Sequence, residues 1–438
     1  MQLLPGRKTM TDETFEYLHE KFGIDRDIIS MVEKAEAGLS GTFRKLDDIL
    51  LHNQYKVLHE FQEARIDNTH FAWNTGYGYD DKGRTALENL FAAIFGAEAG
   101  LVRPTFVNGT HALACCLLGL LRPGDELLYC NGDPYDTMQT VIGIKGNACG
   151  HLKEYGVTYS QVELLPGNEI DIEGIRKAIK PQTKLAVLQR SRGYVFRNAM
   201  TIPQIEAWAK ACHEVKPDLI CMVDNSYGEF TDTKEPTQVG ADIMAASLIK
   251  NAGGGLAVSG AYVVGRRDLV DRVATRMTSP GIGGECGLMF GETRSFFQGL
   301  FIAPRVTMGA VKGAALCAKV FSDAGFAVCP GPDDPRNDIV EAVRLGSPEA
   351  VCAFCEGVQA AAPIDSYVTP IPWDMPGYTD QVIMAAGAFI GGSSIELSAD
   401  APMREPYDVF FQGGITYEHS KFGVIKALQT LKDKGLLK

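Results

Sequence analysis

Ser247-Leu248-Ile249-Lys250-Asn251-Ala252-Gly253-Gly254-Gly255 is the stretch around which the rest of the chain is organised. An apolar segment delivers Lys250 directly into three glycines, where the backbone can pass close to a bulky ligand without Cβ clashes. The next charged residue is Arg266, so this lysine lacks the charged neighbours of a surface helix. Partial burial favours the neutral amine, which is the form that makes a Schiff base with an aldehyde. A lysine that snorkels to solvent from the end of a buried strand fits the stretch equally well, so the other motifs must decide.

The composition is that of a globular protein, with 45% hydrophobic and 22% charged residues. A length of 438 residues predicts one large domain and a smaller one. The formal charge of -12 argues against a nucleic-acid partner or a membrane partner, because either needs a basic face. No apolar run reaches the length needed to span a bilayer, and the first 30 residues are charged from Arg7 onward, unlike a signal peptide. We therefore expect a cytoplasmic protein.

The eleven cysteines are odd in number and lie mostly in apolar segments, which predicts reduced, buried thiols. The single CxxC, Cys352 to Cys355, falls in an expected helix without a second pair. Packing is favoured there over zinc or redox chemistry, and no metal site is predicted. Cys286, in the glycine-rich segment 280–287, is the one loop cysteine that could accept sulfur from a substrate.

Alternating short apolar strands and helices predict an α/β fold, with a large, mainly parallel sheet covered by helices on both faces. The expected strands lie near 100–106, 126–130, 158–162, 184–189 and 220–224, and the expected helices near 112–121, 172–179 and 201–214. From about Arg305 the pattern becomes α+β, with helices at 305–323, 348–361 and 416–433 and strands at 326–329, 338–345 and 367–371. Two helices, at 11–36 and 43–65, precede the sheet. We predict an N-terminal helical arm (1–70), a large cofactor-binding domain (71–305) and a small C-terminal domain (306–438).

Polar residues follow three of the expected strands, and ligands of parallel sheets bind beyond the carboxyl ends of strands. Tyr135 follows the strand that ends near Cys130, and Arg190 and Arg192 follow the strand that ends at Gln189. Asp224 closes a very apolar strand, where a carboxylate is costly unless a cation or a donor meets it. A turn cap is the other role open to Asp224.

Two loops could hold an anion. Asn108-Gly109-Thr110-His111 opens a helix, and a small-residue helix start directs backbone N–H groups and a hydroxyl at one point, which suits a phosphate. An ordinary N-cap formed by Asn108 or Thr110 is the alternative. The loop 74–84, with Tyr77, Tyr79 and Arg84, is either an exposed tether or the lining of an anion site.

Together these features supply what pyridoxal 5′-phosphate needs: a lysine, a strand-end carboxylate for the ring nitrogen, a helix start for the phosphate and an aromatic for the ring. Their order, with Asp224 lying 26 positions before Lys250, resembles that of the fold-type I pyridoxal-phosphate enzymes of the Cys/Met-metabolism group. The chain is most similar to the family of methionine γ-lyase-like, or aluminium-resistance, proteins, which includes cystathionine β-lyases. The motifs that carry this resemblance are Tyr77-Gly78-Tyr79-Asp80, Val107-Asn108-Gly109-Thr110-His111, Gly132-Asp133-Pro134-Tyr135-Asp136-Thr137, Gln189-Arg190-Ser191-Arg192-Gly193-Tyr194, Val223-Asp224-Asn225-Ser226-Tyr227-Gly228-Glu229-Phe230, Ser247 to Lys250, and Ile395-Glu396-Leu397-Ser398-Ala399-Asp400.

The resemblance implies a role for each matching residue at the cofactor. Lys250 would be the Schiff-base lysine and Asp224 the partner of the pyridine nitrogen. Tyr135 would stack on the ring and act as a proton donor. The residues implied at the phosphate are Asn108, Gly109, Thr110, His111 and Ser247.

The resemblance also implies how substrate and subunits meet. Arg404 would grip the substrate α-carboxylate as a bidentate fork. Arg190 and Arg192 would be further substrate contacts, with salt bridges as the alternative, and Glu229 is open between capping, pairing and acting. Tyr77 or Tyr79 with Arg84 would reach the phosphate of a neighbouring subunit, which implies a homodimer or homotetramer.

The implied activity is β- or γ-elimination from a sulfur amino acid of the cystathionine, cysteine or methionine type, giving ammonia, a 2-oxo acid and a thiol. The cofactor residues do not choose the reaction, so an aminotransferase or an aldolase on the same fold stays open. A catalytically silent pyridoxal-phosphate-binding sensor is the alternative of another class.

Overall fold

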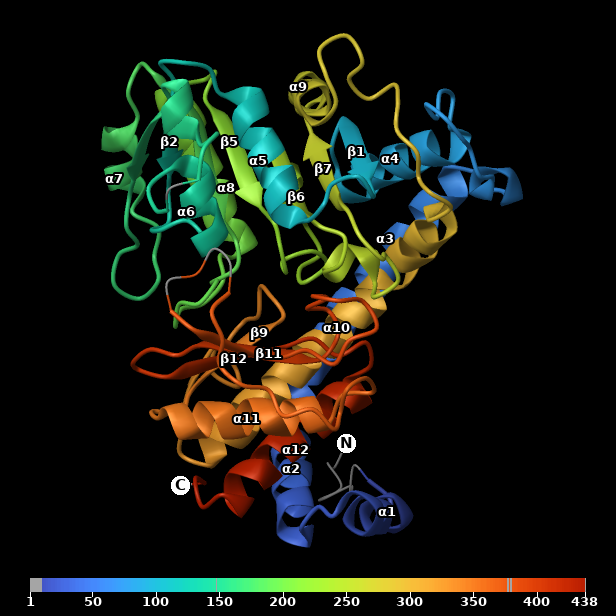
Figure 1. Ribbon diagram of the computed structural model, residues 1–438, viewed down its shortest axis with the longest axis vertical. Helices are drawn as coiled ribbons and strands as arrows, with labels where there is room; N and C mark the ends of the chain where they lie inside the picture. Colours follow the sequence, from blue (N-terminus) through green and yellow to red (C-terminus); the bar gives the residue numbers. More distant parts are fainter. Residues whose placement is uncertain (1–9, 147, 376–377, 379, 438) are drawn as a thin grey trace, which may run out of the picture. The chain divides into compact units, whose positions relative to one another are not determined.

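The computed structural model describes residues 10–146, 148–375, 378 and 380–437 (Figure 1). The chain forms two compact units. The large unit comprises residues 52–193 and 198–304, and the small unit comprises residues 10–51, 194–197 and 305–437. The predicted arm is therefore divided between the two units from residue 10 onward, and residues 1–9 of it lie outside the described residues.

A seven-stranded sheet forms the centre of the large unit. Its order is β1-β7-β6-β5-β4-β2-β3. All neighbouring pairs from β6 to β3 are parallel, and β7 is antiparallel to both of its neighbours. The carboxyl ends of every strand except β7 therefore meet at one edge. The strands are β1 (Ala99–Arg103), β2 (Glu126–Tyr129), β3 (Thr158–Gln161), β4 (Thr183–Gln189), β5 (Ile220–Asp224), β6 (Ile243–Ser247) and β7 (Ala261–Gly265).

Helices cover both faces of this sheet, which confirms the predicted α/β architecture (Figure 1). One face packs on α5 (Gly109–Leu120), α6 (Asp136–Ile142) and α9 (Arg267–Met277). The other packs on α4 (Lys82–Phe95), α7 (Ile172–Ala178) and α8 (Ile202–Val215). In β5, Met222 points to the first core and Cys221 and Val223 to the second. A strand buried on both faces needs a continuous apolar run, which is why this segment could be recognised in the sequence.

The small unit is built on an antiparallel five-stranded sheet of order β10-β11-β12-β9-β8. Its strands are β8 (Ala327–Cys329), β9 (Val340–Arg344), β10 (Val382–Ala385), β11 (Ser398–Pro402) and β12 (Asp408–Gln412). One core joins this sheet to α2 (Arg26–Gly38), α11 (Pro348–Ala360) and α12 (Tyr417–Asp433). Cys355 lies in that core and donates to the Ala399 carbonyl oxygen at 3.9 Å. Cys352 is half-buried in the same helix. The CxxC segment is therefore part of a packed helix, the role that its sequence favoured.

Several element boundaries differ from those predicted. The helix predicted over 11–36 is two helices, because Gly23 caps α1 (Asp12–Phe22) with a φ of 65°. The next helix, α3, spans Ser40–Glu63. The prediction of a strand at 367–371 is wrong. Strands β7, β10, β11 and β12 were not predicted, and the last three belong to the antiparallel sheet of the small unit. Helix α10 (Thr293–Asp323) begins before the predicted start at Arg305, since it continues through Pro304.

Helix α10 also corrects the expectation that no apolar run could span a bilayer. By length and composition it could do so, with a mean hydropathy of 1.3 in its most apolar window. That window is 78% buried inside the protein, as in the core helix of a soluble protein. Cytoplasmic localisation stays a prediction.

Candidate active site

The predicted cofactor residues of the large unit gather at one edge of the sheet. Asp224 is the last residue of β5 and Ser247 the last of the neighbouring β6. The start of α5 packs on β6 so closely that a Cβ on Gly109 would lie 3.1 Å from the Ser247 Cβ. The sheet register therefore brings together a carboxylate, a hydroxyl and a helix start that are far apart in the sequence.

Asp224 is a buried carboxylate in need of a cation. Its Oδ1 accepts a hydrogen bond of 3.1 Å from the Ser226 N–H, so it also caps the turn after β5. Burial raises the pKa of the Asp224 carboxyl, and the positive charge of Lys250 and the Ser226 hydrogen bonds oppose that rise. A protonated ring nitrogen placed at this carboxylate would relieve the cost of burying it.

Lys250 follows β6 and precedes the short 3-10 turn η4 (Asn251–Gly253). The side chain is partly buried, and its Nζ lies 3.8 Å from the centroid of the Tyr227 ring. A cation at that distance from an aromatic face is stabilised by the ring quadrupole. The sequence motif 223–230 contains Tyr227 but predicts no role for it. Its position in the turn after a buried strand was the available signal.

The backbone after Lys250 is held by Asn251. This side chain is fully buried and donates from Nδ2 to the carbonyl oxygens of Tyr227 (2.9 Å) and Glu229 (3.1 Å). We expected the glycines that follow to make room for a ligand, but Gly253 and Gly254 face backbone atoms instead. A Cβ on Gly253 would lie 1.8 Å from the Leu248 carbonyl oxygen, and one on Gly254 2.3 Å from that of Gly299. These glycines allow close backbone packing, which locks the segment behind Lys250.

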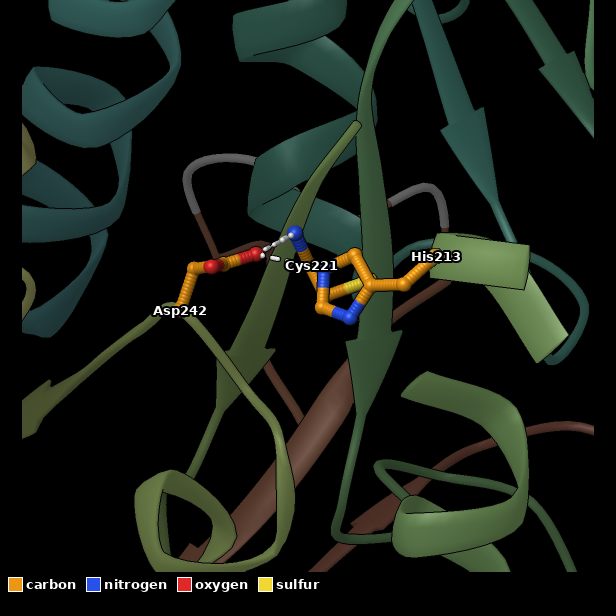
Figure 2. Close-up of side chains that lie close together, drawn as sticks. All are labelled: His213, Cys221 and Asp242. Atoms are coloured by element: carbon orange, nitrogen blue, oxygen red, sulfur yellow. Dashed lines mark hydrogen bonds and ion pairs between the residues drawn. The ribbon is translucent and has the colours of Figure 1, made fainter. Parts of the chain in front are cut away.

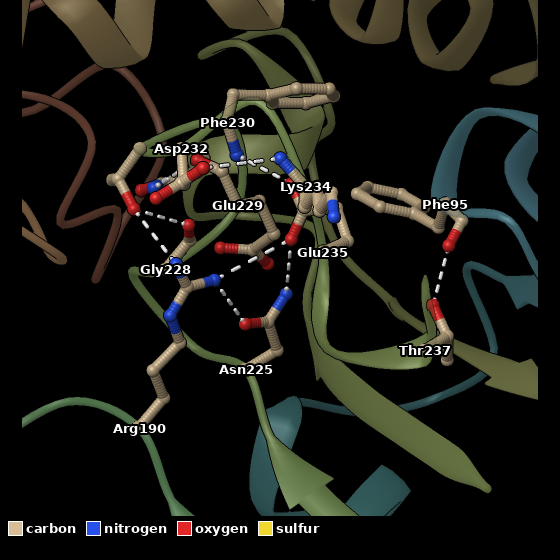
Figure 3. Close-up of polar contacts among 12 residues, drawn as sticks. Phe95, Arg190, Asn225, Gly228, Glu229, Phe230, Asp232, Lys234, Glu235 and Thr237 are labelled. Atoms are coloured by element: carbon tan, nitrogen blue, oxygen red, sulfur yellow. Dashed lines mark hydrogen bonds and ion pairs between the residues drawn. The ribbon is translucent and has the colours of Figure 1, made fainter. Parts of the chain in front are cut away.

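A buried polar network supports the turn that presents Tyr227 (Figure 3). Arg190 is fully buried and donates from Nη1 to Asn225 Oδ1 at 2.8 Å, with Glu235 Oε2 at 3.5 Å. Its Nη2 donates to Thr231 Oγ1 at 3.2 Å. A Cβ on Gly228 would lie 2.4 Å from Arg190 Cδ, so the turn closes directly on this arginine. Arg190 therefore has the salt-bridge role. Its guanidinium bonds residues of the protein, so the structure does not support the predicted contact with substrate.

Glu229 lies in the same turn and is also fully buried. Its Oε1 accepts from the Tyr262 hydroxyl at 2.9 Å, and within the described part of the chain its Oε2 has no hydrogen-bond partner. Burial raises the pKa of Glu229 to about 8, and the negative charge of Glu235 adds to the rise. Glu229 is thus a pairing residue that keeps its proton at neutral pH.

The residues predicted to bind the phosphate at the start of α5 have different roles in the structure. Asn108 is an N-cap, because its Oδ1 accepts from the His111 N–H at 2.8 Å. The His111 ring turns to the preceding loop, where Nδ1 accepts from the Val107 N–H at 3.1 Å. The Thr110 hydroxyl lies 3.0 Å from that of Thr137, at the start of α6. Gly109 and Thr110 therefore remain the residues of this turn whose position suits a phosphate.

Tyr135 occupies the N-cap position of α6, beside the end of β4. Its N–H donates to Gln189 Oε1 at 2.9 Å, and a Cβ on Gly193 would lie 3.3 Å from its ring. Arg192, next to that glycine, is 1% exposed. The loops after β2 and β4 thus place an aromatic ring and a buried arginine at the same edge of the sheet as Asp224.

Two predicted anion ligands, Arg404 and Arg84, have other surroundings. Arg404 belongs to the small unit and is half exposed, with Nη1 paired to Asp380 Oδ2 at 2.9 Å. Arg84 is buried, and it donates to the backbone carbonyl oxygens of Gly78 (2.6 Å), Gly287 (2.7 Å) and Glu285 (2.9 Å). Arg84 therefore connects two loops through hydrogen bonds, and it is not the anion ligand that was predicted.

The two tyrosines of the loop before α4 lie at the surface. Tyr77 and Tyr79 are 75% and 59% exposed, with ring centroids 5.7 Å apart. Cys286, in one of the loops that Arg84 holds, is half-buried, and its hydrogen bond raises the pKa of Tyr79. The exposed pair stays available to a neighbouring molecule.

With this geometry in hand, comparisons with known proteins identify the family. The sequence profile named methionine gamma-lyase matches residues 28–432. The chain belongs to the methionine γ-lyase family. It is 45% identical over 405 residues to the uncharacterized protein YnbB of Bacillus subtilis (strain 168), covering 92% of this chain and 96% of that one.

Solved structures agree with this membership. A carbon-sulfur lyase involved in aluminum resistance from Clostridium novyi NT has a TM-score of 0.92 at 48% identity, covering 96% of this chain and 99% of that one. The pyridoxal-5′-phosphate dependent protein YhfS from Escherichia coli has a TM-score of 0.61 at 15% identity, covering 89% and 97%, and so shares the fold alone. The predicted fold type I is confirmed, and the methionine γ-lyase family and its fold identify pyridoxal 5′-phosphate as the cofactor and carbon-sulfur lyase as the kind of enzyme.

The residues present fit this cofactor of the methionine γ-lyases. Asp224 supplies a buried carboxylate whose raised pKa a cationic ring nitrogen would lower. Lys250 supplies a half-buried primary amine near that carboxylate. Gly109 lets the helix start approach Ser247 closely, because a Cβ there would lie only 3.1 Å from the Ser247 Cβ, and backbone N–H groups at that helix start would meet a phosphate.

Proposed function

We propose that the chain catalyses β- or γ-elimination from a sulfur amino acid, releasing ammonia, a 2-oxo acid and a thiol. The observation that carries the proposal is the meeting of Lys250, Asp224 and the Gly109–Ser247 contact at one edge of the sheet. Membership of the methionine γ-lyase family supports the class of substrate. Cystathionine, cysteine and methionine are the candidates.

When bound, pyridoxal 5′-phosphate supplies an aldehyde for Lys250 and a ring that accepts electrons. Asp224 would hold the ring nitrogen protonated, because a cation there compensates the buried carboxylate. Thr110 and the first N–H groups of α5 would hold the phosphate, and Tyr135 would cover the ring.

Lys250 would also move the proton of the substrate. Its neutral amine takes the proton from the substrate Cα and becomes an ammonium. The Tyr227 ring, 3.8 Å from Nζ, faces that charge and stabilises it. Asn251 holds the backbone of the amine and of Tyr227 in one arrangement, since its side chain donates to the Tyr227 carbonyl oxygen.

Departure of sulfur requires a proton donor, for which we propose the Tyr135 hydroxyl. We propose Arg404 or Arg192 as the residue that binds the substrate carboxylate, because a guanidinium forms a bidentate pair with it. Arg192 has the advantage of a position beside Gly193, against which Tyr135 packs. Lysine in place of the correct arginine should raise KM, and lysine in place of the other should not.

We further propose that a second copy of the chain completes the site through Tyr77 and Tyr79. Both rings are exposed, and their backbone is fixed by Arg84. A rigid, exposed aromatic pair is typical of a surface that is buried by a partner. A homodimer or homotetramer would be the functional form, with no nucleic-acid or membrane partner.

A product screen on the purified holoenzyme tests the activity. Each candidate amino acid should give 2-oxo acid and ammonia in equal amounts, with a thiol as third product. Amino transfer that depends on an added keto acid would instead identify an aminotransferase, and bound cofactor without any product would identify a sensor.

The lysine is tested separately by reduction with borohydride, which should fix the cofactor to the peptide that contains Lys250. The matched control is Lys250→Arg, which keeps a cation above Tyr227 but cannot form the covalent bond. Label recovered on another lysine would contradict the assignment.

A further inference from the structure

A second group of chemically active side chains lies at the opposite edge of the large sheet from Asp224 and Ser247. His213 is near the end of α8, Cys221 is the second residue of β5, and Asp242 directly precedes β6 (Figure 2). One ligand atom from each of the three residues lies within 4.8 Å of the other two. The group contains an imidazole nitrogen, a thiol sulfur and a carboxylate oxygen.

Hydrogen bonds already orient two of the three ligand atoms. Asp242 Oδ2 lies 3.0 Å from His213 Nε2 and accepts from the Cys221 N–H at 2.8 Å (Figure 2). Its other oxygen, Oδ1, accepts from Arg266 Nη1 at 3.2 Å. The Asp242 carboxylate is thus fixed from three sides, and its Oδ2 is directed at the imidazole. A separation of 3.0 Å between nitrogen and oxygen is also close to that between two ligands of one tetrahedral metal ion.

We propose that His213, Cys221 and Asp242 form a binding site for a divalent transition metal of the Zn²⁺ class, with water as the fourth ligand. Nitrogen, sulfur and oxygen together suit Zn²⁺, and a thiolate disfavours Mg²⁺ and Ca²⁺. The metal takes the place of the proton between Nε2 and Oδ2, and the imidazole proton then resides on Nδ1. The Cys221 thiol releases its proton to solvent, so that one thiolate and one carboxylate balance the double charge of the ion.

The surroundings permit an ion to enter. The Cys221 thiol is buried and touches the thiol of Cys212, whereas the His213 side chain is 32% exposed and that of Asp242 10% exposed. Water therefore reaches the site from the side of the imidazole. Arg266 remains on Oδ1, outside the coordination sphere, where it fixes the carboxylate. A bound ion would join the end of α8 to the starts of β5 and β6.

This inference is independent of the proposed activity, and its test does not use turnover. The holoenzyme is stripped with a chelator, dialysed against Zn²⁺ and assayed for metal content. One Zn²⁺ per chain should be retained. X-ray absorption of that ion should show one sulfur at about 2.3 Å and nitrogen or oxygen neighbours at about 2.0 Å. The sulfur neighbour separates this site from any ion held by the cofactor or by surface carboxylates.

Variants assign the ligands. Cys221→Ala and His213→Asn should each weaken Zn²⁺ binding at least tenfold, whereas Cys317→Ala, which removes a fully buried thiol of α10, should bind as the parent does. Failure of the parent to retain a stoichiometric ion, or absorption data without sulfur, would overturn the proposal. Unchanged binding by Cys221→Ala would do the same. If a ligand variant fails to fold, the sulfur distance in the parent decides alone.

Discussion

Glu229→Gln should make the protein more stable at alkaline pH and should leave it nearly unchanged in weak acid. Glutamine has almost the same shape as the neutral acid and can still accept from the Tyr262 hydroxyl, which now bonds Glu229 Oε1 at 2.9 Å. What the substitution removes is the titration of a carboxyl group that is buried completely.

The magnitude follows from the pKa of Glu229, which burial raises from 4.5 to about 8. Between these two values the folded state holds a proton that the unfolded state has lost, so the free energy of unfolding falls as the pH rises through this window. At 1.36 kcal/mol for each factor of ten, the loss reaches an upper bound of roughly 5 kcal/mol above pH 8. Below pH 4.5 it vanishes. Glu235 and Lys250 also act on this carboxyl group, and both are retained in the variant.

The assay compares thermal midpoints of parent and variant at pH 5 and pH 9. The difference between them should be only about 2 °C at pH 5 and should favour the variant by several degrees more at pH 9, since each kcal/mol shifts the midpoint of a unit of this size by roughly 2 °C or more. Other buried acids, such as Glu88 with a pKa of about 7, titrate equally in both proteins and cancel. Glu173→Gln, whose carboxyl group is 76% exposed, is the matched control and should show no pH-dependent difference. A variant that is destabilised equally at both pH values would refute the reasoning, because the carboxyl group would then be ionised throughout.

Two further predictions concern Arg84 and Tyr227. Arg84→Met removes the three hydrogen bonds that the buried guanidinium donates to backbone carbonyl oxygens and should lower stability by about 2–4 kcal/mol, with faster proteolysis near residues 285–287, whereas the exposed ion pair lost in Arg404→Met should cost less than about 1 kcal/mol. Equal thermal midpoints for the two variants would argue against the clamp. Tyr227→Leu removes the ring that faces the Lys250 amine and should reduce kcat/KM about 2- to 30-fold, the equivalent of a cation–π contact of about 0.5–2 kcal/mol. Tyr227→Phe keeps the ring and should retain most of the activity, so a loss as large as that of leucine would show that the hydroxyl, and not the ring, is needed.

The central sheet was predictable because parallel strands buried on both faces require apolar runs, such as the one ended by Asp224. The antiparallel strands were harder to recognise. In the small unit, β11 includes Asp400 and ends in Pro402, so its sequence has neither a continuous apolar run nor a regular alternation. Long-range pairing, and not local pattern, determines such strands.

The arginines illustrate the same limit at the candidate site. An arginine after a strand can face a ligand or pair within the protein, and its neighbours in sequence do not distinguish the two. Arg190 pairs with Glu235 and Asn225, which lie 45 and 35 positions away. Arg84 reaches carbonyl oxygens about 200 positions away. Only folding brings these partners to the guanidinium groups.

The sequence by itself determined the α/β class and the cofactor family, since Lys250, Asp224 and the Gly109 helix start follow in an order and spacing that a parallel sheet brings to one edge. The tertiary structure decided what surrounds them. It placed the Tyr227 ring on the lysine, gave the glycines after Lys250 to backbone packing, and raised the pKa of Glu229 by burial. It also brought His213, Cys221 and Asp242 together from three elements. The physical reason is that burial, electrostatic coupling and close packing depend on distances in space, which the order of residues along the chain does not specify.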